Sequence, residues 1–292
     1  LFWRSVDRHP VSEHPADHFS EQMIIVNSLI AKSLKDQKMK VTAFVGSARK
    51  KHTYHAAEQF LLNLQKLGKV DYEIVSLSDY NLQMCRGCKL CTDKGEEFCP
   101  LDDDRDQLIE KMVHSDGVVF ASPNYAFHVS GRMKVFLDRF NPYLHRPQFF
   151  GKAFTSIVAQ GVYGGGKIIK YFSFIGNGLG FNVVKGSCIT TLEPMTDKGQ
   201  QKIDRTLEHH SRKFYAQLIK RQYPAPSLFK LMAFRWGRTA IREMLNEDFR
   251  DYSHYRDSGW FESDYYYPVK LNPLKKWTGN LFDRMARRSV MK

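Results

Sequence analysis

A short loop near the start of the chain has the residues of an anion site. Val41 to Val45 are apolar or β-favouring and predict a buried strand, and a helix is predicted to begin near Thr53. The first turn of a helix leaves backbone N–H groups without partners and carries the positive end of the helix dipole. Ser47 and Thr53 can add hydroxyl groups, and Arg49 adds a guanidinium group. The loop therefore predicts a phosphate site, with a solvated strand-to-helix turn as the alternative.

The same loop lacks the sequences of two common phosphate-binding motifs. No Gly-Lys-Ser/Thr closes it, so it is not a Walker loop, and the dinucleotide pattern G-x-G-x-x-G is absent. A loop of hydroxyl groups with one arginine instead suits the phosphate of a mononucleotide bound without a metal.

Four of the five cysteines lie within fifteen positions, which indicates metal chemistry. Two residues separate Cys85 from Cys88 and Cys88 from Cys91, and seven separate Cys91 from Cys99. This spacing is close to that of bacterial ferredoxins, and three closely spaced thiolates suit the corners of a 4Fe-4S cluster. Zinc usually takes two separated pairs of ligands, so zinc and free thiols are the alternatives. The fifth cysteine, Cys188, falls in a predicted strand and is expected to be a buried apolar residue.

Length and charge set limits on the function. A chain of 292 residues can hold one large domain with appendages. Its net charge of +13 suits nucleic acid, an anionic membrane or a phosphorylated ligand, and charge alone does not choose among them. No run approaches the roughly 20 apolar residues of a membrane span, and no secretory signal is recognised, so a cytoplasmic protein is expected. Residues 1–38 are interpreted as an N-terminal extension or an artificial remnant, with a short docking helix over 24–34 as the alternative.

Apolar strands alternate with amphipathic helices from Met39 onward. Such alternation predicts an α/β fold with a doubly wound parallel sheet, whose ligands bind beyond the carboxyl ends of the strands. The loops 46–54, 122–129 and 161–166 all follow such ends. The expected strands are 41–45, 70–77, 116–121, 152–160 and 181–190. Helices are expected to begin near 53, 102 and 130, with Asp102 to Asp104 as cap and first-turn acids of the second. A further helical segment is expected between 166 and 181, and Ile203, Leu207, Phe214 and Leu218 mark a last helix.

Four stretches in register make the chain resemble the flavodoxin-like NAD(P)H-dependent FMN reductases, especially their branch related to iron-sulfur flavoproteins. The stretches are Gly46-Ser47-Ala48-Arg49, then Cys85 to Cys91 with Cys99, then Ala121-Ser122-Pro123-Asn124-Tyr125, and finally Gly131 to Arg139. The resemblance covers roughly residues 39–219. It implies a five-stranded sheet of order 2-1-3-4-5 with FMN as the cofactor.

The resemblance also implies a set of FMN contacts. It places the phosphate on Ser47, Arg49, Thr53 and Tyr54, and the ring against Pro123, Asn124, Tyr125, Ala126 and Phe127 and the loop Gly161, Val162, Tyr163 and Gly164. Relatives commonly dimerise, so a homodimer is expected.

Hydride transfer belongs to the flavin, so no acid–base residue is required of the protein. Backbone N–H groups near Asn124 and the Gly-rich loop can stabilise negative charge on the reduced ring. Tyr125, Phe127 and Tyr163 are candidates for stacking on the ring, with ordinary packing as the alternative. Lys134 and Arg139 are expected on a solvated or paired helix face.

Three functions are consistent with these features. The first is an FMN-dependent oxidoreductase that passes hydride from NAD(P)H to a small acceptor such as a quinone, nitro or azo compound. The second is an electron-transfer iron-sulfur flavoprotein with a cluster on the four cysteines. The third is a basic zinc-containing nucleic-acid binder, which is not favoured because the basic residues form no stripe with the cysteines.

The chain changes composition after residue 221, which predicts a boundary between an FMN-binding domain, 39–221, and an extension, 222–292. A helix with Arg235, Arg238 and Arg242 on one face is expected there, docked on the protein or lying on an anionic membrane; docking is favoured. The aromatic residues 258–268 are a candidate lid near the flavin. The basic tail 270–292 is expected to be mobile or to meet acidic groups.

Overall fold

The computed structural model describes residues 38–290. The described residues from Met39 onward form one compact unit. The docking helix expected over 24–34, and with it the interpretation of the N-terminal segment, lies outside the described residues.

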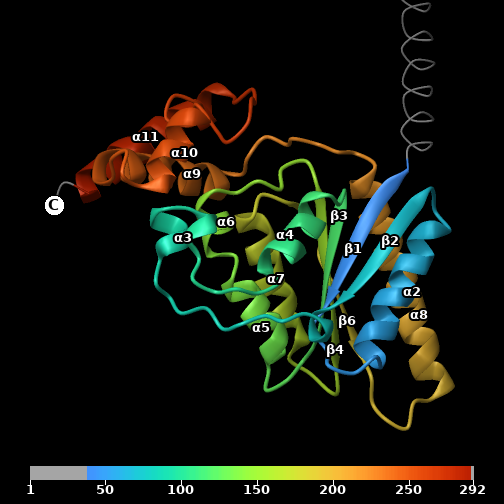
Figure 1. Ribbon diagram of the computed structural model, residues 1–292. Coiled ribbons are helices and arrows are strands. Elements are labelled where there is room, and N and C mark those ends of the chain that lie inside the picture. Colours follow the sequence, from blue (N-terminus) through green and yellow to red (C-terminus); the bar gives the residue numbers. More distant parts are fainter. Residues whose placement is uncertain (1–37, 291–292) are drawn as a thin grey trace, which may run out of the picture. The chain divides into compact units, whose positions relative to one another are not determined.

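A parallel sheet forms the centre of the described chain (Figure 1), with the order β2-β1-β3-β4-β5 and with β6 also paired to β4. The predicted fold class and strand order are confirmed. The strands are β1 Met39–Val45, β2 Val70–Ser76, β3 Gly117–Pro123, β4 Ala153–Gln160, β5 Asn182–Val183 and β6 Ser187–Thr190.

The outermost strand differs from the single run that the sequence predicts over 181–190, because it is split into β5 and β6. Ala153 pairs with Asn182 and Ile157 with Ser187, so three residues of β4 lie opposite four of the outer strand. One extra residue of this kind makes a bulge. At the bulge, a Cβ on Gly186 would lie 2.4 Å from the carbonyl oxygen of Ser156, so the backbone comes too close for a larger residue.

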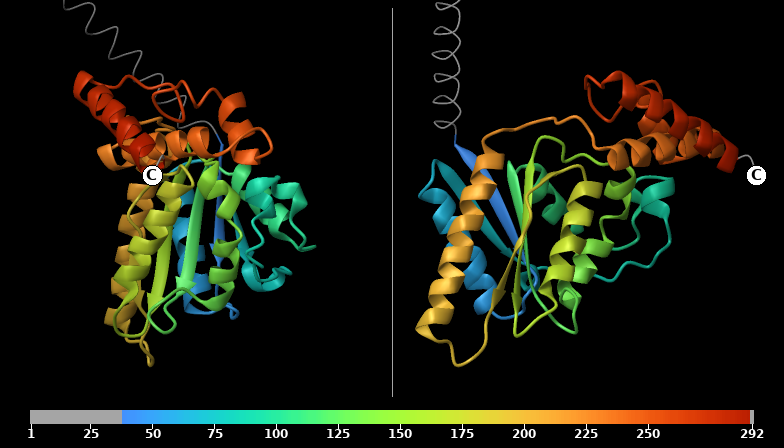
Figure 2. Two further views of the ribbon diagram at one scale, coloured as in Figure 1. Left: turned by 90° about the vertical axis from the view of Figure 1, so that its left-hand side faces the viewer. Right: turned by 180° about the vertical axis from the view of Figure 1, so that it is seen from behind.

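Helices cover both faces of the sheet (Figure 2). Residues of α4, α5 and α7 pack on one face and residues of α2 and α8 on the other. The helices are α2 His52–Gln65, α3 Leu90–Asp93, α4 Arg105–Val113, α5 Gly131–Asp138, α6 Asn141–His145, α7 Gly165–Gly178, α8 Asp197–Leu218, α9 Leu228–Met244, α10 Arg250–Asp257 and α11 Pro273–Val290, with 3-10 turns at Leu77–Asp79 and Glu96–Phe98.

The central strands are buried on both faces, as their apolar sequences predict. Phe44 of β1 and Phe120 of β3 point to the face covered by α5, where both rings contact Phe136 with centroids 5.2 and 5.8 Å away. The opposite face carries smaller side chains against α2 and α8. Burial of this continuous apolar layer fixes the three strands side by side.

Among the acids predicted to cap α4, Asp103 accepts a hydrogen bond from the N–H of Arg105, the first residue of the helix, at 3.2 Å. The helix begins at Arg105, and the side chain of the N-cap residue Asp104 makes no capping hydrogen bond. Asp104 instead accepts a hydrogen bond from the N–H of Asn81 at 2.7 Å. Asp103 accepts from the N–H of Gln83 at 2.9 Å and forms a buried ion pair with Arg139. These carboxylates therefore hold the segment that leads into the cysteine loop.

The C-terminal region is helical and docked on the sheet domain. The described part of the basic tail predicted over 270–292 forms α11. It meets acidic groups, the second of the two predicted alternatives, because Arg287 pairs with Glu243 and Lys276 with Asp264. Arg235 and Arg238 are buried and form ion pairs with Asp283 of α11. Asp251 of α10 pairs with Arg146, which lies just after α6. These contacts place the first two of the three predicted face arginines inside the protein.

The predicted lid also lies elsewhere. Trp260, Phe261 and Tyr265 belong to a separate core with α9 and α10. This core contacts Phe150, which precedes β4, so it lies at the amino ends of the strands, opposite the loops that follow them (Figure 1). Within residues 38–290, every helix is too short or too polar to cross a membrane.

His210 of α8 gives a prediction about pH. Its ring lies between the hydroxyl groups of Thr155 and Ser187, at 2.6 and 2.8 Å, and burial lowers its pKa to about 3. The unfolded chain therefore binds a proton that the folded chain excludes, so stability falls as the pH drops from about 6.5 towards 3, by up to about 1.4 kcal/mol per pH unit. We expect His210→Gln to reduce this slope, measured by urea unfolding between pH 7 and pH 5. The exposed His114→Gln should keep the wild-type slope, and an unchanged slope in His210→Gln would contradict the assignment.

Ser130, the N-cap of α5, gives a prediction about stability. Its Oγ accepts from the N–H of Met133 and donates to the carbonyl oxygen of Gly46 at 2.6 Å, in a buried position. Ser130→Ala removes a cap and leaves that carbonyl without its partner, so we expect a loss of about 2–3 kcal/mol in the free energy of unfolding. Ser227→Ala, which removes only the cap of α9, should cost about 1 kcal/mol. Equal losses in the two variants would show that the bond to Gly46 contributes nothing.

Candidate functional site

The start of α2 is open to a ligand. The side chain of its N-cap residue, Lys51, makes no capping hydrogen bond, and no acidic residue lies in the first turn. Side chains cap α5, α8 and α9 at the same position. Within the described residues, the backbone N–H groups of His52, Thr53 and Tyr54 have no acceptor. They present donors and the positive helix end to an anion, as the sequence predicts.

The side chains of the loop before α2 support the same chemistry. Thr53 and Ser47 are buried, with 4% and 9% of their surfaces exposed. Ser47 Oγ donates to the carbonyl oxygen of Arg49 at 3.0 Å and so holds the turn. Lys50 lies over the ring of Tyr54, 5.7 Å from its centroid. Arg49, Lys50 and Lys51 together give the loop a positive potential.

One cavity of 350 Å³ joins the loops that follow β1, β3 and β4. Its predicted members are Ser47, Arg49, Thr53, Pro123, Asn124, Tyr125 and Gly161. The other predicted residues, Tyr54, Ala126, Phe127, Val162, Tyr163 and Gly164, are not among its lining. Asn124 Nδ2 nevertheless donates to the carbonyl oxygen of Tyr163 at 2.9 Å, and the rings of Phe127 and Tyr163 contact each other with centroids 5.3 Å apart. The second and third loops are thus joined beside the cavity.

The loop after β3 contains a strained turn. Ala126 and Phe127 have φ of 48° and 61°, and Tyr125 and His128 exchange two backbone hydrogen bonds of 3.0 Å. Two successive left-handed residues describe a type I′ turn, which usually takes Asn or Gly. Each such residue costs about 1–2 kcal/mol. The turn leaves the rings of Tyr125 and Phe127 about half exposed, at 53% and 55%. Strain of this kind is often found at ligand sites.

Asn124 has an unused acceptor. Its backbone N–H donates to the carbonyl oxygen of Ala159 at 2.7 Å and its Nδ2 is bonded to the third loop, but its Oδ1 is buried without a partner. A buried acceptor without a partner is costly, so a ligand with an N–H group would stabilise this position. Gly164 lies close by, with φ of 100°, where a Cβ would lie 2.8 Å from Phe127. Only glycine leaves the space that this loop needs.

Sequence reasoning missed a fourth wall of the cavity. Thr191, Leu192 and Glu193 follow β6 and line it, together with His52. His52 Nε2 lies 2.9 Å from Glu193 Oε1, and this hydrogen bond, with the charges of His52 and Lys51, lowers the pKa of Glu193. The signal was present, because these residues follow a predicted strand just as the other three loops do.

The four clustered cysteines line a second cavity, of 380 Å³. Cys85 and Cys88 are exposed, and Cys91 and Cys99 are partly buried. Cys85 accepts a hydrogen bond from the N–H of Gly87 at 3.4 Å, and Cys99 accepts from Arg139 at 3.5 Å. Burial raises the pKa of Cys91. In residues 38–290 no three His, Cys, Asp or Glu side chains are arranged around a single ion.

All four thiols line one cavity, and hydrogen bonds to sulfur atoms, as at Cys85 and Cys99, are typical of iron-sulfur sites. Cys188 lies apart from the other four, packed partly against the core, and burial raises its pKa to about 11, in agreement with its prediction as an apolar residue.

The chain matches known proteins over the same region. The model of the family described as NADPH-dependent FMN reductase matches residues 39–191. An iron-sulfur flavoprotein of Archaeoglobus fulgidus is 35% identical over 164 residues, which are 51% of this chain and 71% of the relative. An iron-sulfur flavoprotein of Clostridioides difficile is 28% identical over 222 residues, 73% of this chain and 94% of the relative.

Solved structures support the fold. RosB, solved with bound 8-demethyl-8-formylriboflavin-5'-phosphate, aligns with a TM-score of 0.52 at 12% identity over 80% of this chain and 92% of its own. A flavone reductase aligns with a TM-score of 0.50 at 14% identity over 65% of this chain and 66% of its own. The family match spans about half of the chain and includes the anion loop and all four clustered cysteines. This chain is therefore a flavodoxin-like oxidoreductase that belongs to the NADPH-dependent FMN reductase family.

Proposed function

We propose that the protein passes hydride from NAD(P)H through FMN to a small acceptor such as a quinone, nitro or azo compound. One observation carries the proposal: the uncapped start of α2 and the loops after β1, β3 and β4 line a single cavity. FMN, when bound, supplies the hydride chemistry, so the protein must bind the cofactor, orient its ring and keep water away.

The anion loop would hold the phosphate of FMN. The three N–H groups of His52, Thr53 and Tyr54 supply donors without a metal, and the hydroxyl group of Thr53 adds another. Ser47 lines the same cavity and holds the turn through its hydrogen bond to Arg49. Arg49 adds charge to the same cavity. The residues present therefore fit a phosphate monoester.

The loops after β3 and β4 would hold the flavin ring. Asn124 Oδ1 has no partner and can accept a hydrogen bond from a ring N–H group. The strained turn places Tyr125 in the lining of the cavity and Phe127 against Tyr163 beside it, so these rings would give the flavin an aromatic wall that excludes water. Backbone N–H groups nearby would stabilise negative charge on the reduced ring.

The cysteine loop supports a second candidate, electron transfer through a 4Fe-4S cluster held by Cys85, Cys88, Cys91 and Cys99. The four residues line one cavity, and α5 spans the distance between the two sites. Its N-cap residue bonds the loop after β1, and its last residue, Asp138, lines the cysteine cavity. A helix of eight residues is about 12 Å long, so the cluster would lie near the flavin.

The homodimer that the resemblance implies stays a prediction. Contact of the C-terminal region with a membrane surface is also a proposal, supported by a stripe of exposed apolar residues on α11, namely Leu274, Trp277, Leu281 and Met285.

The proposed phosphate site can be tested by comparing the binding of FMN with that of riboflavin. Arg49→Gln and Thr53→Val each remove a donor to the phosphate, so we expect the Kd for FMN to rise about tenfold. The Kd for riboflavin, which lacks the phosphate, should change less than about twofold. Flavin fluorescence quenching measures both constants, and Lys66→Gln, which lies outside the cavity, is the control. Equal weakening for both flavins, or no flavin binding by the wild type, would refute the proposed site.

The cluster can be tested by composition. Protein purified without oxygen should contain iron and acid-labile sulfide, and Cys88→Ser should lose most of both while keeping FMN. Cys188→Ser, outside the cysteine cavity, should retain the wild-type iron content. Visible absorption and iron analysis give the result, and zinc or empty thiols in the wild type would exclude the second candidate.

A further inference from the structure

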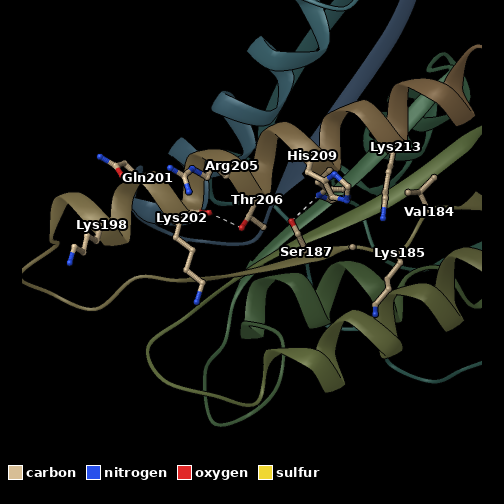
Figure 3. A pocket seen from close by; sticks show the side chains of 12 residues that line it. Val184, Lys185, Ser187, Lys198, Gln201, Lys202, Arg205, Thr206, His209 and Lys213 are labelled. Carbon is tan, nitrogen blue, oxygen red and sulfur yellow. Dashed lines mark hydrogen bonds between the residues drawn. The ribbon is translucent and has the colours of Figure 1, made fainter.

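A basic cavity of 690 Å³ lies between α8 and the outer edge of the sheet (Figure 3). The flavin proposal does not use it. Its lining residues are Val184, Lys185, Gly186, Ser187, Lys198, Gln201, Lys202, Arg205, Thr206, His209, His210 and Lys213. Five of these are lysines or arginines, and none is acidic.

One face of α8 supplies most of this charge. Lys198, Lys202, Arg205, His209 and Lys213 recur at intervals of three or four residues, so they lie above one another along the helix. The acidic residues of α8 do not line the cavity. Like charges along one helix face destabilise the helix unless something neutralises them.

Nothing in the described part of the chain neutralises these side chains. No carboxylate lies within ion-pair distance of Lys185, Lys198, Lys202, Arg205 or Lys213 in residues 38–290. The arginines of α9, by contrast, are matched by buried carboxylates. The basic cavity therefore holds several positively charged side chains that have no carboxylate partner within the described residues.

The bulge between β5 and β6 forms the opposite wall. It places Lys185 across from α8, and Figure 3 shows the ammonium groups of Lys185, Lys202 and Lys213 on the same side of that helix. The inner part of the cavity is uncharged, because His210 is held neutral between Thr155 and Ser187. A concave site with a neutral base and a basic rim suits a compact anion.

A third cavity neighbours both this cavity and the candidate flavin site. An intermediate cavity of 470 Å³ shares Lys202 and Thr206 with the basic cavity and Leu192 with the flavin cavity. The three cavities are thus adjacent along β6 and the start of α8.

We propose that the basic cavity binds a small ligand that carries two or more phosphate groups, as the phosphate-bearing part of a dinucleotide does. Lysine ammonium groups bind phosphate as point charges, and the volume lies in the range of small-molecule sites. The concave shape favours a small ligand over nucleic acid. The site rests on its own residues and does not depend on the flavin proposal.

Inorganic pyrophosphate is the probe, titrated by calorimetry into FMN-loaded protein so that the anion loop is occupied. Lys202→Gln/Lys213→Gln should weaken pyrophosphate binding about tenfold or more. Lys66→Gln/Lys220→Gln removes the same charge from exposed positions outside the cavity and should change binding less than about twofold. Arg49→Gln should leave binding unchanged, which separates this site from the anion loop even if FMN does not bind there.

Three results would overturn the proposal. The first is no binding of pyrophosphate to the wild type, and the second is an equal loss in the two double variants, which would show only a net-charge effect. The third is binding of a short RNA or DNA to this face without any binding of pyrophosphate.

Kinetics identify the source of the phosphates. If the ligand is the nicotinamide co-substrate, Lys202→Gln/Lys213→Gln raises KM for NADPH, leaves kcat unchanged, and pyrophosphate competes with NADPH. If the ligand is a separate effector, the variant loses pyrophosphate binding and keeps the wild-type KM. Both results support the site, and they distinguish its two uses.

Discussion

The parallel pairing of β1, β3 and β4 is the constraint on which the rest of the structure depends. Val45 pairs with Ala121, and Pro123 pairs with Ala159. The carboxyl ends of the three strands therefore lie at the same edge of the sheet. The N–H of Gly46 bonds to Ala121, and the N–H of Asn124 to Ala159, which continues the pairing into the loops. Three loops far apart in the sequence therefore meet at one edge. A slip of one residue would move the large rings of Phe44 and Phe120 to the face that carries smaller side chains, so packing fixes this register.

Arg139 joins the two candidate redox sites in one packed unit. From the end of α5 it forms a buried ion pair with Asp103 and donates to the carbonyl oxygen of Gln83 and to Cys99. Removal of one partner from such a buried pair is strongly destabilising, which keeps the cysteine loop at one end of α5. The other end of α5 is fixed to Gly46 through Ser130. The helix thus sets the separation of the two sites.

Positive charge is used differently in three parts of the molecule. Near α2 it surrounds unpaired N–H groups, and along α8 it borders an open cavity. In the C-terminal region, Arg235 and Arg238 are buried against Asp283, where they hold α9 to α11. The net charge of +13 therefore does not arise from a single basic surface. The role of each cationic side chain follows from the groups that it contacts.

The sequence by itself determined the features that depend on local patterns. Strand and helix periodicity predicted the α/β class, and the loop after Gly46 indicated a candidate anion site. The spacing of Cys85 to Cys99 placed four thiols on one segment. Each of these signals lies in residues that are close together in the sequence. Tertiary structure decided the bulge at Gly186, the wall at Glu193, the partners of Asp103 and the basic face of α8. These depend on which distant backbone lies alongside and on whether a carboxylate approaches each cation, and a single segment of sequence carries no information about either.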